Sequence, residues 1–271
     1  MTGVNPEHRQ SNYQVRFDWG LDGATAVAKE ADVAVIVDVL SFTTTLSVAV
    51  DAGIEVFPYP VADSAAEYAT RRDAAVAVRR SRAMPGDVSL SPASIRSTGA
   101  TLRRLVLPSP NGSTISHALG EASRVCVGAS LRNAQAVAAW ILAEVGSDSV
   151  IAVIAAGERW PGGTLRPAVE DLWGAGAVIS TLIEEGCEAS VEAEVAAAGW
   201  HAVQSDVASA LRRCGSGREL AAAGYECDVD VAAEIDRSAA VPVLQGESFV
   251  DIRWSAGQPN STPCARGSSS E

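Results

Sequence analysis

Residues 33–53 read VAVIVDVLSFTTTLSVAVDAG, an apolar run that admits one carboxylate, Asp38, and then three consecutive threonines. Up to Leu40 the run is apolar at nearly every position rather than at every second one. Such a pattern is typical of a central strand that is covered on both faces. The stretch therefore predicts a buried strand that ends near Asp38 and is followed by a helix that begins at the threonines.

Other short apolar runs repeat this pattern and are separated by segments long enough for helices. These runs occupy residues 54–59, 75–80, 104–109, 124–129 and 149–157. Alternating strands and helices indicate an α/β protein with a largely parallel sheet. From Ala168 onward, successive Ala-rich segments predict mainly helices. We expect a single domain over residues 1–254 and a disordered tail, rich in Ser, Pro and Gly, over residues 255–271.

The composition excludes several classes of protein. The chain has 271 residues, of which 47% are hydrophobic, enough for a globular protein with a substantial core. Its net charge is −12 and its basic residues are scattered, so we expect no binding to nucleic acid. The N-terminus lacks the apolar core of a signal peptide, and no apolar run approaches the ~20 residues of a membrane span, so we expect a cytoplasmic protein without a membrane partner. The five cysteines are widely spaced, which indicates neither a zinc site nor a disulfide framework.

Asp38 and the threonines fit a ligand site at the end of the predicted strand. In an open α/β sheet, ligands bind beyond the carboxyl ends of the strands, where the following helices present free N–H groups. Thr43, Thr44 and Thr45 would add hydroxyl donors for an anion, and a carboxylate beside an anion site suits a divalent cation between the two. The alternative is that a Ser or Thr only caps the helix and that Asp38 accepts main-chain hydrogen bonds in a turn.

A second hydroxyl-rich helix start lies in residues 107–120, LPSPNGSTISHALG. A short apolar run leads into a turn that contains Asn111 and Gly112, and Ser113 then opens the next helix. The arrangement resembles that of residues 38–45. We therefore expect Asn111, Gly112 and Ser113 to provide neutral donors at the same edge of the sheet.

A third helix start follows the run 124–129 and contains Arg132 and Asn133. Arg132 would place a positive charge at a helix N-terminus, which is unfavourable for the helix dipole unless an anion or an acid lies nearby. We expect Arg132 and Asn133 to face an anionic ligand. The alternative for Arg132 is an arginine that faces solvent.

The segment 155–178 carries the adjacent carboxylates Glu170 and Asp171 near the start of a predicted helix. Acids in the first turn stabilise a helix through its dipole by ~0.3–1 kcal/mol each, which would explain both without a ligand. Carboxylates also suit Mg²⁺, which binds a few protein oxygens together with waters and substrate phosphate. Neighbouring residues on a helix point about 100° apart, so we expect only one of the two to reach a metal site. Glu158 is a weaker candidate.

The order of these motifs resembles that of the 2-phosphosulfolactate phosphatase (ComB-like) family. The motifs are DVLSFTTT (38–45), SPNGST (109–114), GASLRNAQAVA (128–138), VEDLWGAGAV (169–178) and the segment 215–242. Each is short, and it is their succession from about Val33 to about Pro242 that carries the resemblance. The resemblance implies a three-layer α/β/α sandwich and Mg²⁺-dependent hydrolysis of 2-phospho-3-sulfolactate, a small anionic phosphate ester, to 3-sulfolactate and phosphate on the route to coenzyme M.

This implied activity agrees with the roles expected from the residues. We expect Mg²⁺ to be held by Asp38 and by Glu170 or Asp171, and we place Asn111 and Asn133 among the catalytic groups. Substrate would be bound by a set of donors at the helix starts, namely Thr43, Thr44, Thr45, Gly112, Ser113 and Arg132. The nucleophile and the general acid stay unassigned. Two-fold dimers are the commonest soluble assembly, so a homodimer is one expectation.

Two departures from the family pattern concern substrate binding. Where the family typically has Asp-Val-Leu-Arg, this chain has Ser41, and a serine cannot replace the two-point contact of arginine with an anionic group. Of an expected Gly-Asn-Ser-Pro turn, only Ser91-Pro92 is present. The candidates for a compensating charge are Arg96, Arg132, Arg159 and Arg166. Two alternatives to an active phosphatase therefore stay open: a degenerate homologue that binds a phosphorylated metabolite without turnover, and a protein whose helices over residues 189–236 serve as an oligomer interface.

Overall fold

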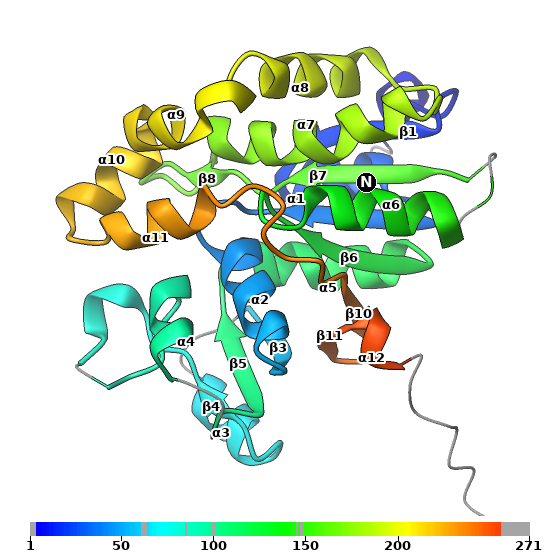
Figure 1. Cartoon of the computed structure of the whole chain (residues 1–271). Helices are drawn as coiled ribbons and strands as arrows, with labels where there is room; N and C mark the ends of the chain where they lie inside the picture. The colour runs from blue at the N-terminus through cyan, green and yellow to red at the C-terminus, as the bar shows by residue number, and fades with distance from the viewer. Residues whose placement is uncertain are drawn as a thin grey trace, which may run out of the picture.

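The computed structural model describes residues 4–60, 64–84, 86–98, 101–144, 146 and 149–255. Helices cover both faces of a central sheet (Figure 1), so the molecule has the predicted three-layer α/β/α architecture. The tail that we expect to be disordered lies, apart from Ser255, outside the described residues.

The central sheet contains nine strands within the described residues, in the order β1-β7-β2-β6-β10-β11-β3-β5-β4. Their bounds are β1 Val15–Trp19, β2 Val33–Val37, β3 Glu55–Tyr59, β4 Ala75–Val76, β5 Arg104–Pro108, β6 Val125–Ala129, β7 Ile151–Ala155, β10 Pro242–Gln245 and β11 Ser248–Asp251. Strands β1, β7, β2 and β6 run parallel to one another, as do β3, β5 and β4. The β10–β11 hairpin joins the two groups through antiparallel pairing with β6 and with β3. The sheet is therefore largely parallel, and its antiparallel pairs involve this hairpin.

The helices connect the strands and then continue beyond the last parallel strand. Their bounds are α1 Gly20–Val27, α2 Phe42–Asp51, α3 Ala65–Thr70, α4 Pro92–Thr98, α5 Gly112–Ala122, α6 Ala134–Glu144, α7 Val169–Glu184, α8 Val191–His201, α9 Val207–Arg213, α10 Gly215–Ala222, α11 Glu226–Ala232 and α12 Ile252–Ser255. Short 3₁₀ turns cover Pro6–Arg9, Arg80–Arg82 and Gln204–Asp206, and a separate small hairpin pairs β8 (Glu158–Arg159) with β9 (Leu165–Arg166). The predicted helical character of the chain after Ala168 is confirmed over α7 to α11.

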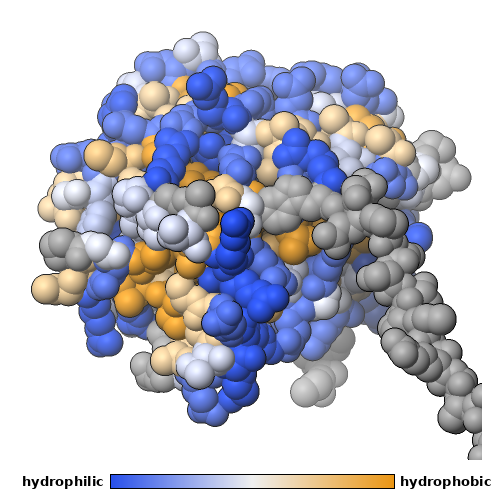
Figure 2. All heavy atoms as spheres, turned by 60° about the horizontal axis from the view of Figure 1, so that its bottom comes forward, coloured by the Kyte–Doolittle hydropathy of each residue, from blue (hydrophilic) through white to orange (hydrophobic). Residues whose placement is uncertain are grey.

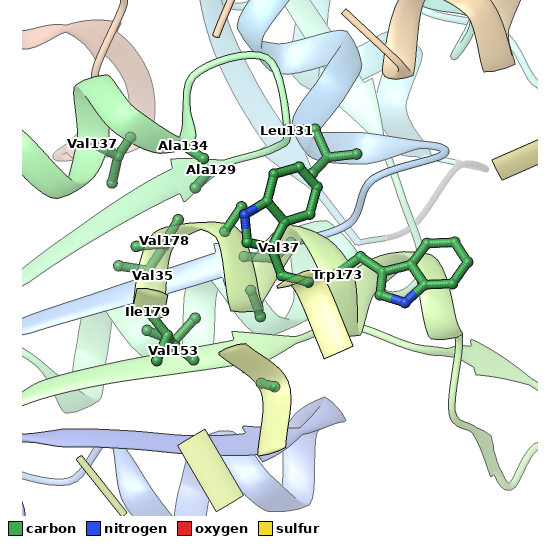
Figure 3. Close-up of a cluster of buried hydrophobic side chains, with 14 of the residues drawn as sticks. Val35, Val37, Ala129, Leu131, Ala134, Val137, Val153, Trp173, Val178 and Ile179 are labelled. Carbon is green, nitrogen blue, oxygen red and sulfur yellow. The ribbon is translucent and has the colours of Figure 1, made fainter. Parts of the chain in front are cut away.

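Strand β2 shows why the opening run is apolar at each position. Val33, Val35 and Val37 point into the core cluster beneath α6 and α7, whereas Ala34 and Ile36 point into the cluster beneath α1, α2 and α5. Figure 3 shows the first cluster, with Val35 and Val37 close to side chains of α6 and α7. All five β2 side chains are fully buried. Because each buried valine or isoleucine contributes about 1.5–3 kcal/mol relative to an exposed one, this strand is fixed at the centre of the sheet.

The sheet contains three strands that the sequence analysis does not predict. Each predicted run contains a strand, but β1, β10 and β11 are additional. Strand β1 carries Arg16 and Asp18 and lies at the edge of the sheet, where the buried Arg16 side chain donates to the main-chain oxygens of Tyr13 and Ser11. A short strand with two charged residues has little of the apolar pattern on which the prediction rests.

The C-terminal helices lie at the end of the molecule where β2 ends. Helices α10 and α11 follow α9, and Figure 1 shows them next to the β8 region. Residues of α10 and the Leu40-Ser41 segment that follows β2 line one cavity. A site at this edge of the sheet is therefore enclosed by elements far apart in the sequence.

The surface is mixed in character. Figure 2 presents the lower side of Figure 1, where hydrophilic residues surround smaller groups of hydrophobic ones. Among the described residues, no helix has both the length and the apolar character that crossing a membrane requires.

Candidate active site

Four carboxylates gather where β2 and β7 end. Asp38 follows β2, Glu158 follows β7, and Glu170 and Asp171 lie in the first turn of α7. Asp38, Glu170 and Asp171 are 7%, 2% and 3% exposed, and Glu158 is half-buried. The structure thus brings together the three predicted metal-site carboxylates and adds Glu158. We call these four residues the carboxylate cluster.

Asp171 connects the two strand ends through main-chain hydrogen bonds. Its Oδ1 accepts from the N–H of Val39 at 2.7 Å, and its Oδ2 accepts from the N–H of Gly157 at 2.9 Å. Burial raises the pKa of Asp171 well above its ordinary value, and the negative charge of Asp38 raises it further. Asp171 therefore holds the ends of β2 and β7 at a fixed separation beside Asp38.

The cluster is electrostatically unfavourable by itself. Burial raises the pKa of Asp38 to about 7, and the charges of Glu158 and Glu170 add to the shift, although the N–H of Phe42 and the Arg80 guanidinium oppose it. Burial also raises the pKa of Glu158, against the effect of Arg166. Like charges in a poorly solvated site disfavour ionisation. A cation bound among these carboxylates would remove that penalty.

Two arginines lie beside the cluster. The Nε of Arg80 donates to Oδ2 of the buried Asp228 at 2.8 Å, and its Nη2 donates to the main-chain oxygen of Leu40 at 3.0 Å. Arg166 donates from Nη2 to Oγ of Ser216 at 3.1 Å. Residues including Arg80, Ser216 and Glu158 line a cavity of about 320 Å³ that also contains Ser41. This cavity therefore combines negative and positive charge, as binding of a metal together with an anion requires.

The three threonines bond to the main chain. Thr43 Oγ1 accepts from the N–H of Asp38 and donates to its carbonyl, both at 2.8 Å. Thr44 Oγ1 donates to the carbonyl of Val39 at 2.6 Å, and Thr45 Oγ1 donates to that of Leu90 at 2.9 Å. All three side chains are buried. They hold the main chain around Asp38 in place and do not present hydroxyls to a ligand, contrary to the substrate-binding role expected of them; the N-cap residue Ser41 makes no side-chain capping bond either.

Asn111, the residue before α5, lies close to the segment that carries Glu158. Asn111 Nδ2 donates to the carbonyl of Gly157 at 3.2 Å, and its Oδ1 accepts from Nε of Arg159 at 2.8 Å. Ser113 is buried and donates to the carbonyl of Leu107. A side chain at Gly112 would place its Cβ 2.4 Å from the Phe42 ring. Gly112 and Ser113 therefore pack and anchor α5, and Asn111 lines a second cavity of about 320 Å³ together with Glu158.

Asn133 and Arg132 follow β6, the neighbour of β2, and both hydrogen-bond to other groups of the protein. Asn133 Oδ1 accepts from the N–H and the hydroxyl of Ser130, and its Nδ2 donates to the carbonyls of Gly128 and Ala240. Because Asn133 is fully buried and each polar atom of its side chain has partners, it offers nothing to a ligand in this arrangement.

The Arg132 side chain contacts the second half of α2 and not the first turn of that helix. Its Nη1 donates to Ser47 Oγ at 2.9 Å and pairs with Asp51 at 3.3 Å, and its Nε pairs with Glu234 at 3.2 Å. The acid that we expect near the Arg132 charge is therefore supplied by the protein itself, through Asp51 and Glu234.

Of the four arginines considered as replacements for a cation at position 41, Arg166 contacts Ser216 in the cavity that contains Ser41, and Arg159 lines the second cavity with Glu158. Arg96 pairs with Glu234, and Arg159 binds Asn111 and the carbonyl of Gly163. Arg80, which the sequence analysis did not single out, lines the same cavity as Ser41. Arg79 and Arg80 together end the predicted run 75–80, so the sequence holds no signal that distinguishes Arg80 from its neighbour.

The donors of the cluster suit Mg²⁺. Within the described residues, no three or more His, Cys, Asp or Glu side chains form a ready metal cage. Mg²⁺ usually takes one or two protein carboxylates and completes its shell with waters and substrate phosphate, so such a cage is not required. Both oxygens of Asp171 already accept main-chain hydrogen bonds. The hard oxygen donors that fit the ion best are therefore those of Asp38 with Glu158 or Glu170.

Comparison with known proteins agrees with this geometry. Residues 23–247 match the model of the 2-phosphosulpholactate phosphatase family. A probable 2-phosphosulfolactate phosphatase of Deinococcus radiodurans is 30% identical over 228 residues, which are 79% of this chain and 88% of the relative. Proteins of the same description from Thermus thermophilus and Prochlorococcus marinus are 32% and 28% identical, again over 79% of this chain and 89% of each relative. The chain therefore belongs to the 2-phosphosulpholactate phosphatase family of phosphoric monoester hydrolases.

Proposed function

We propose that the protein is a Mg²⁺-dependent phosphatase that hydrolyses 2-phosphosulfolactate, or a related phosphorylated hydroxy acid, to the hydroxy acid and phosphate. The observation that carries this proposal is the carboxylate cluster with Arg80 and Arg166 beside it, at the carboxyl ends of β2 and β7. The names of the relatives support the substrate. With that substrate, the reaction would take place in the cytoplasm and contribute to coenzyme M biosynthesis.

The residues of the cluster have separate tasks. Asp38 with Glu158 or Glu170 would hold Mg²⁺, which neutralises charge on phosphoryl oxygens. Asp171 positions Asp38 by tying the ends of β2 and β7 together. Asn111 holds the carbonyl of Gly157 and thereby supports the start of the segment that carries Glu158. These contacts keep the carboxylates in place before substrate binds.

Arg80 and Arg166 would bind the anionic groups of the substrate. Arg80 is oriented by Asp228 and by the carbonyl of Leu40, and it lies over the Tyr225 ring at 6.0 Å. A guanidinium with such fixed partners keeps its other N–H groups available for carboxylate or sulfonate oxygens. We infer that Arg80 supplies the positive charge that Ser41 lacks, because the two residues line the same cavity.

The proposal is tested by measuring phosphate release. Purified protein is incubated with 2-phosphosulfolactate, phospholactate and other small phosphate esters, with Mg²⁺ or with a chelator. We expect metal-dependent release that falls by at least about two orders of magnitude in Asp38→Asn, since the metal contributes several kcal/mol of charge stabilisation. The matched control is Asp230→Asn, because Asp230 is an exposed aspartate that pairs with Arg212. Equal release by the two variants would contradict the assignment of Asp38.

A second candidate function is favoured by Ser41. If the lost arginine is essential for turnover, the protein binds a phosphorylated metabolite without hydrolysing it. Calorimetry with the same esters separates the two functions: binding with no phosphate release by folded protein would support the degenerate homologue. In that case Ser41→Arg is the variant in which turnover should return.

A further inference from the structure

A large groove of the molecule shares Trp19, Asp22 and Leu165 with the cavity that Asn111 and Glu158 line. It has a volume of about 820 Å³ and lies between β1 and α1 on one side and α8 on the other. Its apolar walls include Phe17, Trp19, Leu172, Val191 and Val195. No member of the carboxylate cluster lines it. A mostly apolar cavity of roughly 300–1,000 Å³ is the usual size for binding a small organic molecule.

Helix α8 leaves apolar side chains exposed along this groove. Val191 and Val195 are 62% and 59% exposed, and they lie one helical turn apart. Leu165 of β9, also in the groove, is 41% exposed. Exposed valines that are grouped around a cavity are more informative than scattered ones, because a contiguous apolar patch marks a binding surface.

The polar groups of the groove are mainly acidic. Asp18, Asp22 and Glu192 line it, and within the described part of the chain none of them forms an ion pair. His8 is the basic residue among the lining side chains. Asp18 is half-buried, and a Cβ at Gly23 would lie 2.8 Å from its side chain, so the glycine leaves the room that Asp18 occupies against α1. An apolar groove edged by unpaired carboxylates is complementary to a cation with an apolar body.

Aromatic side chains strengthen this complementarity. The rings of Phe17 and Trp19 meet edge to face at 5.6 Å, and both line the groove. Tryptophan attracts organic ammonium groups through its π face, and nearby carboxylates add direct charge attraction. We propose that this groove binds an organic ammonium ion that carries an aromatic or alkyl group. The phosphate ester of the proposed function is excluded from it, because three carboxylates repel an anion.

The test compares three probes of similar shape and different charge. Calorimetry at neutral pH measures the binding of 4-phenylbutylammonium, 4-phenylbutanol and 4-phenylbutyrate to the full chain, without metal or phosphate ester. We expect the ammonium ion to bind about tenfold more tightly than the alcohol at low salt, with a smaller preference at high salt, and the carboxylate to bind most weakly.

Two variants of α8 locate the binding. Glu192→Gln should lower the affinity for the ammonium ion and leave that for the alcohol unchanged. Glu194→Gln is the matched control, because Glu194 is exposed on the same helix and does not line the groove. Both residues are exposed, so neither variant should affect folding.

Four results would overturn the proposal. They are absence of ammonium binding, equal affinity for the alcohol, an equal effect of the two α8 variants, and self-association of the chain that Val195→Asp abolishes. The last would assign the groove to a second copy of the chain. Since no phosphate ester is present, these outcomes are independent of whether the protein proves to be a phosphatase.

Discussion

Two charged regions of this molecule, one buried and one partly exposed around the buried Arg132, are built in opposite ways. In the carboxylate cluster, acids face acids, and the pKa of Asp38 is raised to about 7 by burial and by Glu158. Around Arg132, charges of opposite sign alternate, and hydrogen bonds from Arg96 lower the pKa of Glu234. In the second region protein charges of opposite sign pair with one another, whereas the first would need a bound cation to compensate its carboxylates. The raised pKa values of the first region are those expected of a candidate binding site.

The largest expected effect on stability concerns the region around Arg132. Arg132→Met removes the shared cation and leaves Asp51 and Glu234 without it, although Arg96 still pairs with Glu234. Asp51 and Glu234 are partly exposed and stay solvated, so the loss comes from the hydrogen bonds of the buried guanidinium, about 1.5–3 kcal/mol for each bond to a charged group. Urea unfolding of the wild type and the variant measures this loss.

The control for this prediction is an exposed pair of the same chemistry. Arg212 and Asp230 pair at 2.7 Å, with both side chains more than half exposed. Arg212→Met should change the free energy of unfolding by about 0–1 kcal/mol. If the two methionine variants lose equal stability, the region around Arg132 is not the stabilising network that the comparison requires.

The second effect concerns the cluster and depends on pH. A carboxyl whose pKa is higher in the folded state than its ordinary 3.8 stabilises the protein at low pH, and this contribution is lost as the pH rises through the folded value of about 7. In chelator, the wild type should therefore lose stability between pH 4 and 7.5, and Asp38→Asn should lose about 2 to 4 kcal/mol less. Urea midpoints across this range measure the difference.

Two further measurements sharpen this prediction. Asp230→Asn should follow the wild-type pH dependence, because its carboxylate lies outside the cluster. Addition of Mg²⁺ should reduce the fall in wild-type stability, because a bound cation favours the ionised carboxylates. Parallel curves for the wild type and Asp38→Asn would show that the cluster carries no unfavourable charge.

Prediction of the fold from the sequence succeeded where both faces of a strand are covered. The run at β2 could be identified because Val33 to Val37 are apolar without interruption, and the other parallel strands share this property. The β10–β11 hairpin was missed, although Gln245-Gly246-Glu247-Ser248 contains a signal for it. Gly246 has a φ of +62°, which a tight hairpin turn requires, and the two strands pair on either side of it.

The three carboxylates predicted for the site, Asp38, Glu170 and Asp171, lie together in the structure, whereas their role in binding a metal stays a prediction. Asp38 follows the end of β2, and Asp171 in the first turn of α7 reaches it by accepting from the N–H of Val39 and of Gly157, which follows the neighbouring strand β7. The sequence pattern does not tell a hydroxyl that faces a ligand from one that binds a carbonyl, so the prediction that Thr43 binds substrate is not supported by its hydrogen bonds to the main chain of Asp38. Arg80 reaches the cavity through tertiary contacts with Asp228 and Tyr225, which lie more than a hundred residues away and which no local pattern reveals.

The smallest expected effect asks what holds the cluster in place. Thr43→Val removes the hydroxyl that accepts from the N–H of Asp38 and donates to its carbonyl. A buried N–H that loses its partner costs about 1–3 kcal/mol, so unfolding should require less urea. Because the affected main chain carries Asp38, phosphate release should also fall.

Two comparisons decide whether this effect belongs to the hydroxyl. Thr43→Ser keeps the hydroxyl and should restore most of the stability and the activity. Thr70→Val, at an exposed threonine that donates to the carbonyl of Ala66, should change stability by no more than about 0.5 kcal/mol. If Thr43→Ser is as damaged as Thr43→Val, then the packing of the threonine methyl group holds Asp38 in place, and the hydrogen bonds do not. The repulsive cluster would then depend on the surrounding apolar core, as the region around Arg132 depends on its ion pairs.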